Sequence, residues 1–338
     1  MRTPRSRRLP WRPPAVVTAI AALTAATAIA LTGPAAAAPD GSRLDHLEDG
    51  PGRVTDMYVY SAAMRTVVRA QVLRAADPDR PAPTLYLLNG ANGGVGGGWY
   101  DETDVSRFFA GEQVNVVIPI GGAGSYFTDW RTDDPVLGRP RWKTFLTEEL
   151  PPIVDATLNG NGANAIAGLS MAATAVFHLA ETAPGLYRAI GAYSGCVRTS
   201  DPEGQAMVTA VVGRWAGNAT NMWGPPGDPA WAANDPYLHA DLLRDTTIYV
   251  SSGTGVPGAL DTLEGVHGDP TQLAWQLMFG APLEAVMHHC TVNLRDRLAQ
   301  LGIPATFDFR PDGTHSWGYW EQDLHRSWPI IEAALNRP

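Results

Sequence analysis

Ser170 is the side chain of this sequence best placed for covalent chemistry. It lies in Gly168-Leu-Ser-Met-Ala172, after a short apolar run and before a helix-forming stretch. A strand, a tight turn with a serine at its apex and a helix are typical of a nucleophile elbow, whose strained turn needs small flanking residues. Gly168 meets that need, and Ala172 stands where a second glycine is usual. The alternative is an ordinary turn at which the serine only caps the helix.

A serine hydroxyl is a weak nucleophile and needs a neighbouring base. In hydrolases that use such an elbow, an acid and then a histidine follow the serine along the chain. His315 fits this order, because it lies in Asp312-Gly-Thr-His-Ser-Trp317, a loop just after the last predicted strand. A histidine in that loop reaches back over the sheet edge to the serine. The alternative is a histidine in a surface loop.

The acid that orients the imidazole is less well defined by position. Four carboxylates lie between the serine and the histidine, namely Asp261, Glu264, Asp269 and Glu284. Position alone favours Asp261 or Glu264, because both come soon after the predicted strand at residues 246–251.

An acyl-transfer site also needs backbone donors for the oxyanion, each contributing about 3–4 kcal/mol in the transition state. One is expected to be the N–H of Met171, the residue after the serine. The second is expected from the loop Asn89-Gly-Ala-Asn92, where Ala91 is our candidate.

Two rival motifs lack the context that they require. Residues 253–258 match G-x-G-x-x-G after a strand, but Pro257 sits in the segment that should open a helix, and no helical pattern begins there, as a dinucleotide site would need. Glu284 and His288 have the i, i+4 spacing of metal ligands, yet no second pair accompanies them. We therefore expect no cofactor and no metal.

The elements around these residues predict one fold class. Strands are expected at residues 54–60, 66–73, 84–88, 114–120, 163–167, 189–194, 246–251 and 305–309. Helical patterns cover residues 171–182, residues 282–301 and the tail from residue 321 onward. Such alternation predicts an α/β fold with a mostly parallel central sheet and helices on both faces.

Residues 1–38 resemble an export signal, with five arginines, an apolar stretch and a small-residue cleavage site at Ala38. The alternative is a retained membrane anchor. We expect cleavage, which leaves a single domain at residues 39–338 and no transmembrane span. Loss of the five arginines changes the formal net charge from −9 to −14. A protein this acidic is a poor candidate for nucleic acid or an anionic lipid surface.

Two cysteines, Cys196 and Cys290, complete the inventory. In an exported protein an even number of cysteines favours a disulfide, the alternative being two buried thiols.

Six segments of the chain, in the right order, resemble the antigen 85 mycolyltransferases, secreted acyltransferases of mycolate-walled bacteria. They are Tyr86-Leu-Leu-Asn-Gly90, Pro119-Ile-Gly-Gly122 with Asp129-Trp130, Trp142-Lys-Thr-Phe-Leu-Thr-Glu-Glu-Leu-Pro151, Gly168-Leu-Ser-Met-Ala-Ala173, Met222-Trp-Gly-Pro225 with Asp228-Pro-Ala-Trp231 and Asn234-Asp-Pro236, and Gly313-Thr-His-Ser-Trp317. The resemblance implies an α/β-hydrolase fold.

The resemblance also implies roles for particular residues. A Ser–Glu–His triad falls on Ser170, Glu284 and His315, and the oxyanion hole falls on Ala91 with Met171. Ser316 and Trp317 sit where family members contact substrate. Cys196 and Cys290 are not the family's usual disulfide.

The loop after residues 84–88 departs from the family. There the family reads Asp-Gly-Leu-Arg and uses both charges to bind trehalose, whereas this chain has Asn89 and Asn92. We keep both as candidate substrate contacts, although amides bind sugar hydroxyls less strongly than charged groups.

These observations predict a secreted or cell-envelope serine acyltransferase. The expected donor is a glycolipid like trehalose monomycolate, and the acceptor is a sugar hydroxyl. One alternative is a secreted carboxylesterase that uses water. The other is a catalytically silent, wall-binding relative.

Overall fold

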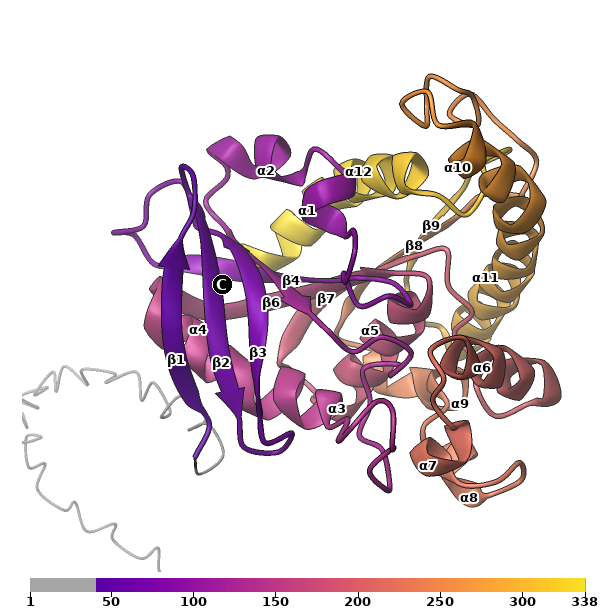
Figure 1. Ribbon diagram of the computed structural model, residues 1–338, viewed down its shortest axis with the longest axis horizontal. Coiled ribbons are helices and arrows are strands. Elements are labelled where there is room, and N and C mark those ends of the chain that lie inside the picture. The colour runs from indigo at the N-terminus through magenta and orange to yellow at the C-terminus, as the bar shows by residue number, and fades with distance from the viewer. Residues whose placement is uncertain (1–40, 338) are drawn as a thin grey trace, which may run out of the picture. The chain divides into compact units, whose positions relative to one another are not determined.

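Most of the strands form a parallel sheet that is extended at one edge by antiparallel strands (Figure 1). The computed structural model describes residues 41–337, so the predicted signal at residues 1–38 lies outside the described residues. Within them, nine strands form one sheet in the order β1-β2-β3-β5-β4-β6-β7-β8-β9. Strands β1 to β3 and the β3–β5 pair are antiparallel, and the rest are parallel. The strands are β1 (Arg43–Asp49), β2 (Val54–Ser61), β3 (Thr66–Leu73), β4 (Ala82–Leu88), β5 (Asn115–Ile120), β6 (Gly160–Leu169), β7 (Tyr187–Tyr193), β8 (Thr247–Ser252) and β9 (Thr306–Phe309).

Helices cover both faces of the sheet, as predicted. Alternate residues of each central strand point to opposite faces, so Tyr86 of β4 packs in one core cluster and Leu87 in the other. The first cluster includes α4 and α5, and the second includes α1, α2 and α12. The helical segments are α1 (Trp99–Glu102), α2 (Val105–Phe108), η1 (Phe109–Gly111), α3 (Trp142–Thr144), η2 (Phe145–Glu149), α4 (Leu150–Leu158), α5 (Met171–Thr182), α6 (Pro202–Arg214), α7 (Ala219–Trp223), α8 (Pro229–Ala233), α9 (Pro236–His239), η3 (Ala240–Leu243), α10 (Pro270–Trp275), η4 (Gln276–Gly280), α11 (Ala281–Leu301) and α12 (Trp317–Leu335).

All eight predicted strands are present, and the predicted fold class is confirmed. Strand β1 was not predicted, because its sequence is polar and most of its side chains are exposed. Helix α12 begins at Trp317, four residues earlier than predicted, with Ser316 as its N-cap. Among residues 41–337, no helix combines the length and apolar character that a bilayer crossing requires.

The predicted disulfide is also confirmed. Cys196, three residues beyond the end of β7, is bonded to Cys290 in the middle of α11, with an S–S distance of 2.07 Å. The bond therefore links the end of a central strand to the helix that begins beside the candidate site.

Candidate active site

The turn between β6 and α5 holds Ser170 in a strained conformation. Ser170 has φ 55° and ψ −122°, in a region that residues with a Cβ rarely adopt. Its N–H donates to the Tyr193 carbonyl at 2.8 Å, which ties the turn to β7. A Cβ on Gly168 would lie 2.7 Å from the Ala172 Cβ, so the strand and helix cross too closely for any side chain there. The structure therefore presents the Ser170 hydroxyl at the tip of a tight strand-to-helix turn.

His315 reaches this hydroxyl from the loop between β9 and α12. Its Nε2 lies 2.8 Å from the Ser170 Oγ, and its Nδ1 lies 2.8 Å from Glu284 Oε2. The imidazole packs edge-on against the Trp320 ring, with 4.8 Å between the two ring centroids. The His315 backbone N–H donates to the Gly280 carbonyl at 3.2 Å. The ring is therefore fixed on two sides and can accept a proton from the serine on the third.

Glu284, in the first turn of α11, is fully buried. While Oε2 faces His315, Oε1 accepts hydrogen bonds from the Ser194 hydroxyl at 2.7 Å and the Gly253 N–H at 2.7 Å. Arg310 donates to the same oxygen at 3.3 Å. A buried carboxylate needs such donors to remain charged. These contacts leave Glu284 oriented toward the imidazole.

Arg310 and Asp323 extend the site below Glu284 as a buried ion pair, which sequence reasoning missed. Burial raises the pKa of Asp323 to about 6, and the neighbouring guanidinium opposes this shift. Burial acts to lower the pKa of Arg310, but the two carboxylates outweigh it and the pKa lies above its ordinary value. The cluster thus keeps one cation between Glu284 and Asp323.

The other three candidate acids lie elsewhere. Asp261 accepts hydrogen bonds from Tyr319, from the Gln276 amide and from the Gly258 N–H, and it holds the loop together. Glu264 is exposed, and Asp269 caps the N-terminus of α10. The preference for Asp261 or Glu264 by chain position is thus not supported: the imidazole Nδ1 contacts Glu284, whereas Asp261 accepts a hydrogen bond from the Thr314 hydroxyl beside His315 and Glu264 is exposed.

The two segments that carry the expected oxyanion donors both adjoin the Ser170 turn. Met171 opens α5, and its N–H is among those at a helix N-terminus that lack an intrahelical acceptor. The loop holding Ala91 passes against the turn, since a Cβ on Gly90 would lie 3.5 Å from the Ser170 Cβ. The Ala91 carbonyl accepts from the Gly124 N–H at 3.0 Å, which fixes the loop's orientation.

The two candidate sugar-binding asparagines have local partners. Asn89 is fully buried, with Oδ1 accepting from the Trp99 N–H at 3.0 Å and Nδ2 donating to the Pro119 carbonyl at 3.4 Å. Asn92 donates to the Gly97 carbonyl at 2.7 Å and accepts from the Gly94 N–H. Both side chains hold the glycine-rich loop in shape. The burial of Asn89 argues against direct contact with a sugar.

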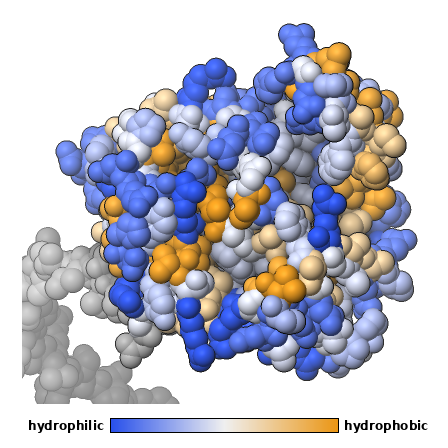
Figure 2. Space-filling view, in the orientation of Figure 1, coloured by the Kyte–Doolittle hydropathy of each residue, from blue (hydrophilic) through white to orange (hydrophobic). Residues whose placement is uncertain are grey.

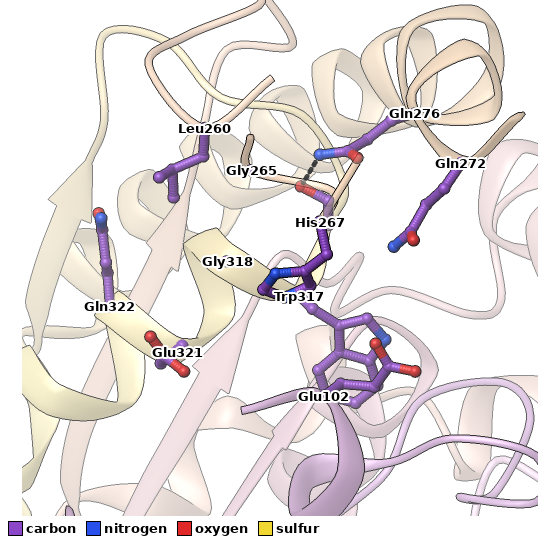
Figure 3. A pocket seen from close by; sticks show the side chains of 11 residues that line it. Glu102, Leu260, Gly265, His267, Gln272, Gln276, Trp317, Gly318, Glu321 and Gln322 are labelled. Carbon is purple, nitrogen blue, oxygen red and sulfur yellow. Dashed lines mark hydrogen bonds between the residues drawn. The ribbon is translucent and has the colours of Figure 1, made fainter. Parts of the chain in front are cut away.

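Ser316 and Trp317 line a cavity of about 210 Å³ that adjoins the histidine loop (Figure 3). The Ser316 hydroxyl accepts from the Gln276 amide at 2.7 Å, the contact that is dashed in the figure. The Trp317 indole packs edge-on against Trp99 and Trp320. Polar side chains from α1, α10, η4 and α12 dominate the remaining lining, which includes Glu102, Gln272, Glu321 and Gln322. Amides and carboxylates around an indole are suited to an uncharged polyhydroxylated ligand.

The rival motifs serve this same site. Gly253, the first glycine of the G-x-G-x-x-G match, donates its N–H to Glu284, and a Cβ there would lie 2.7 Å from the Asp312 carbonyl. His288 contacts the Ser252 hydroxyl through Nδ1 at 3.2 Å, while Glu284 faces His315. No group of three potential metal ligands occurs among residues 41–337.

Comparison with known proteins gives consistent results. The family described as "Putative esterase" matches residues 61–329. Diacylglycerol acyltransferase/mycolyltransferase Ag85A of Mycobacterium tuberculosis is 33% identical over 265 residues, which cover 75% of this chain and 74% of that protein. Diacylglycerol acyltransferase/mycolyltransferase Ag85B of Mycobacterium leprae is 31% identical over 328 residues, which cover 93% of this chain and 92% of that protein.

Solved structures agree with these sequence matches. The crystal structure of Mycobacterium tuberculosis MPT51 (FbpC1) superimposes with a TM-score of 0.70 at 25% identity, covering 84% of this chain and all of that one. The serine hydrolase FphF of Staphylococcus aureus gives a TM-score of 0.61 at 17% identity, covering 85% of this chain and 100% of its own, and supports the fold alone.

Proposed function

Because this chain belongs to the esterase family and is related to the antigen 85 mycolyltransferases, we propose that it is a serine acyltransferase. It moves a mycolyl-type acyl chain from a trehalose ester to a sugar hydroxyl. The proposal is carried by one observation, the continuous contact from Ser170 Oγ through the His315 ring to Glu284, with both distances 2.8 Å.

The first half-reaction forms an acyl-enzyme. The Ser170 Oγ attacks the ester carbonyl as its proton passes to His315 Nε2. The N–H groups of Met171 and Ala91 stabilise the negative charge that develops on the carbonyl oxygen. When the tetrahedral intermediate collapses, the C–O bond to the donor sugar breaks and Nε2 returns the proton to the leaving sugar oxygen.

The second half-reaction reverses these roles. An acceptor hydroxyl gives its proton to His315 Nε2 and attacks the acyl carbonyl, and the Ser170 oxygen leaves with that proton. Glu284 keeps the Nδ1 proton in place and stabilises the imidazolium in both halves. Arg310 acts through Glu284, whose charge it balances.

The polar cavity beside Trp317 is our proposed acceptor site. Its support is its place next to the histidine loop and its lining of amides and carboxylates. A sugar held there is positioned for attack, which favours transfer over hydrolysis. In this proposal the acceptor does not contact Asn89.

Export to the cell envelope is also proposed. It is supported by the arginine-rich, apolar sequence of residues 1–38 and by the Cys196–Cys290 disulfide, which suits an oxidising compartment.

Two measurements test the proposal. Incubation with a trehalose ester should yield a trehalose diester and free trehalose, whereas free fatty acid alone would assign the protein to the carboxylesterases. A fluorophosphonate should label the wild type and fail to label Ser170→Ala. A wild type that resists labelling would identify a silent relative.

A further inference from the structure

Exposed apolar side chains are concentrated around α10. Of twelve large apolar side chains that are exposed among residues 41–337, seven lie between residues 256 and 286. Four of them are consecutive or nearly so, and we call these four the α10 patch: Trp275 is 45% exposed, Leu277 38%, Met278 69% and Phe279 58%. Figure 2 shows apolar surface over α10 at the upper right of the molecule. Large apolar side chains are rarely gathered this way on a surface without a partner.

The patch and the proposed acceptor cavity lie on two sides of one helical segment. Gln272 and Gln276, four residues apart, line the cavity. Trp275 and Phe279 are also four residues apart, with ring centroids 6.1 Å from each other. Residues at this spacing share a face of a helix. The segment α10–η4 therefore presents amides to the cavity and large apolar groups to the outside.

This segment is also connected directly to the catalytic loop. The carbonyl of Gly280, the residue after the patch, accepts a hydrogen bond from the backbone N–H of His315 at 3.2 Å. A surface that contacts the patch consequently contacts the segment that lines the cavity on its other face and bonds to the histidine loop at its end.

The charge of the residues around the α10 patch indicates which kind of surface the patch can contact. Between Arg244 and Arg295 the chain contains no Lys or Arg. Asp261, Glu264 and Asp269 lie in the loop that leads into α10. Anionic lipid surfaces attract clusters of basic residues, which this region lacks. A lipid layer with uncharged headgroups matches both the apolar side chains and this charge.

We propose that the α10 patch docks onto a lipid surface whose headgroups are uncharged sugars. The inference rests on the proposed function, because such a layer is where an acylated sugar resides. Trp275, Met278 and Phe279 enter the boundary between headgroups and acyl chains, as the apolar face of an interfacial helix does. The cavity lined by Gln272 and Gln276 then opens at the depth of the sugars.

Cosedimentation with vesicles tests this directly. Phosphatidylcholine vesicles containing a trehalose fatty-acid ester are compared with vesicles containing phosphatidylglycerol. The variant Met278→Ser/Phe279→Ser should bind the first kind about tenfold or more weakly than the wild type, because two large apolar groups are lost. The control Leu238→Ser/Leu242→Ser removes side chains that are 44% and 54% exposed, and it should bind like the wild type.

Activity separates this inference from the proposed function. All variants should cleave p-nitrophenyl butyrate in solution at the wild-type rate, which shows that they are folded. Unchanged vesicle binding by the patch variant, or tighter binding to anionic vesicles, would overturn the docking proposal. So would a wild-type dimer that the patch variant dissociates, since a second copy would then cover the patch. Vesicle binding that depends on the patch, in a protein that transfers no acyl group, would support docking and refute only the proposed reaction.

Discussion

Replacing Glu284 by glutamine tests the proposed triad most sharply, because the surroundings dictate how the new amide must lie. Three groups donate to Oε1 of Glu284: the Ser194 hydroxyl, the Gly253 N–H and the Arg310 guanidinium. The last two cannot become acceptors. In Glu284→Gln the amide oxygen must therefore occupy the Oε1 position, with the NH₂ group facing His315.

That orientation reverses the proton arrangement of the imidazole. The amide N–H donates to Nδ1, so the ring proton moves to Nε2 and points at the Ser170 hydroxyl. His315 can then no longer accept the serine proton. A wrong tautomer of this kind costs about 10⁴-fold in kcat, or about 5–6 kcal/mol of activation free energy. We expect that loss in kcat/KM of Glu284→Gln.

The assay is the hydrolysis of p-nitrophenyl butyrate, with urea unfolding to establish that each variant is folded. Glu264→Gln is the matched control, because its carboxylate is exposed, and it should keep wild-type activity. Asp261→Asn, at the acid that chain position favoured, should lose less than tenfold. The reasoning fails if folded Glu284→Gln keeps more than a tenth of the activity, or if Asp261→Asn loses as much.

Three further changes have defined outcomes. Gly168→Ala should lower kcat and stability, since overpacking costs about 1–3 kcal/mol; Ala172→Gly should partly restore both in kinetic and urea assays, and no restoration would contradict the 2.7 Å contact. Loss of the disulfide in Cys290→Ser should reduce the unfolding free energy by about 4–5 kcal/mol in the chain-entropy account, because it closes a 94-residue separation; equal urea midpoints for the wild type with and without reductant would refute this. Burial lowers the pKa of His178 to about 4 and raises that of Glu181 well above its ordinary value. Because the folded-state pKa of His178 is lowered, its contribution to the free energy of unfolding is present above pH 6.5 and is lost as the pH falls to 4. The carboxyl of Glu181, whose pKa is raised, contributes at low pH, and that contribution is lost as the pH rises. In Glu181→Gln only the histidine effect remains, so unfolding free energy should fall by about 3 kcal/mol between pH 6.5 and 4 relative to His178→Gln/Glu181→Gln; parallel pH curves for the two variants would exclude the linkage.

The parallel sheet could be predicted because its central strands are buried on both faces and read as short apolar runs. Strand β1 could not, since only one side of it meets the protein and its sequence, Arg-Leu-Asp-His-Leu-Glu-Asp, resembles a polar loop. The elbow at Ser170 was visible because strain restricts which residues can flank it.

The acid and its partners were harder, because long-range contacts create them. Asp261 ends up beside Thr314 and Tyr319, and the first turn of α11 supplies the carboxylate that contacts the imidazole. Only the resemblance pointed to Glu284. The sequence pattern does indicate that Asp323 is buried, because it lies with Trp320, Leu324 and Trp328 at the spacing of one buried helix face. A carboxylate in that stripe requires a buried cation, and Arg310 directly follows the last strand.

The bond between Cys196 and Cys290 makes the intervening segment a closed covalent ring. Helices α6 to α11 as far as Cys290, including the helix that bears Glu284, belong to that ring. The disulfide lies six residues from Glu284 along α11 and two residues from Ser194, whose hydroxyl donates a hydrogen bond to the Glu284 carboxylate. Local opening of α6 to α10 can therefore occur without separating Glu284 from β7, because the short covalent path through Cys290 and Cys196 stays closed.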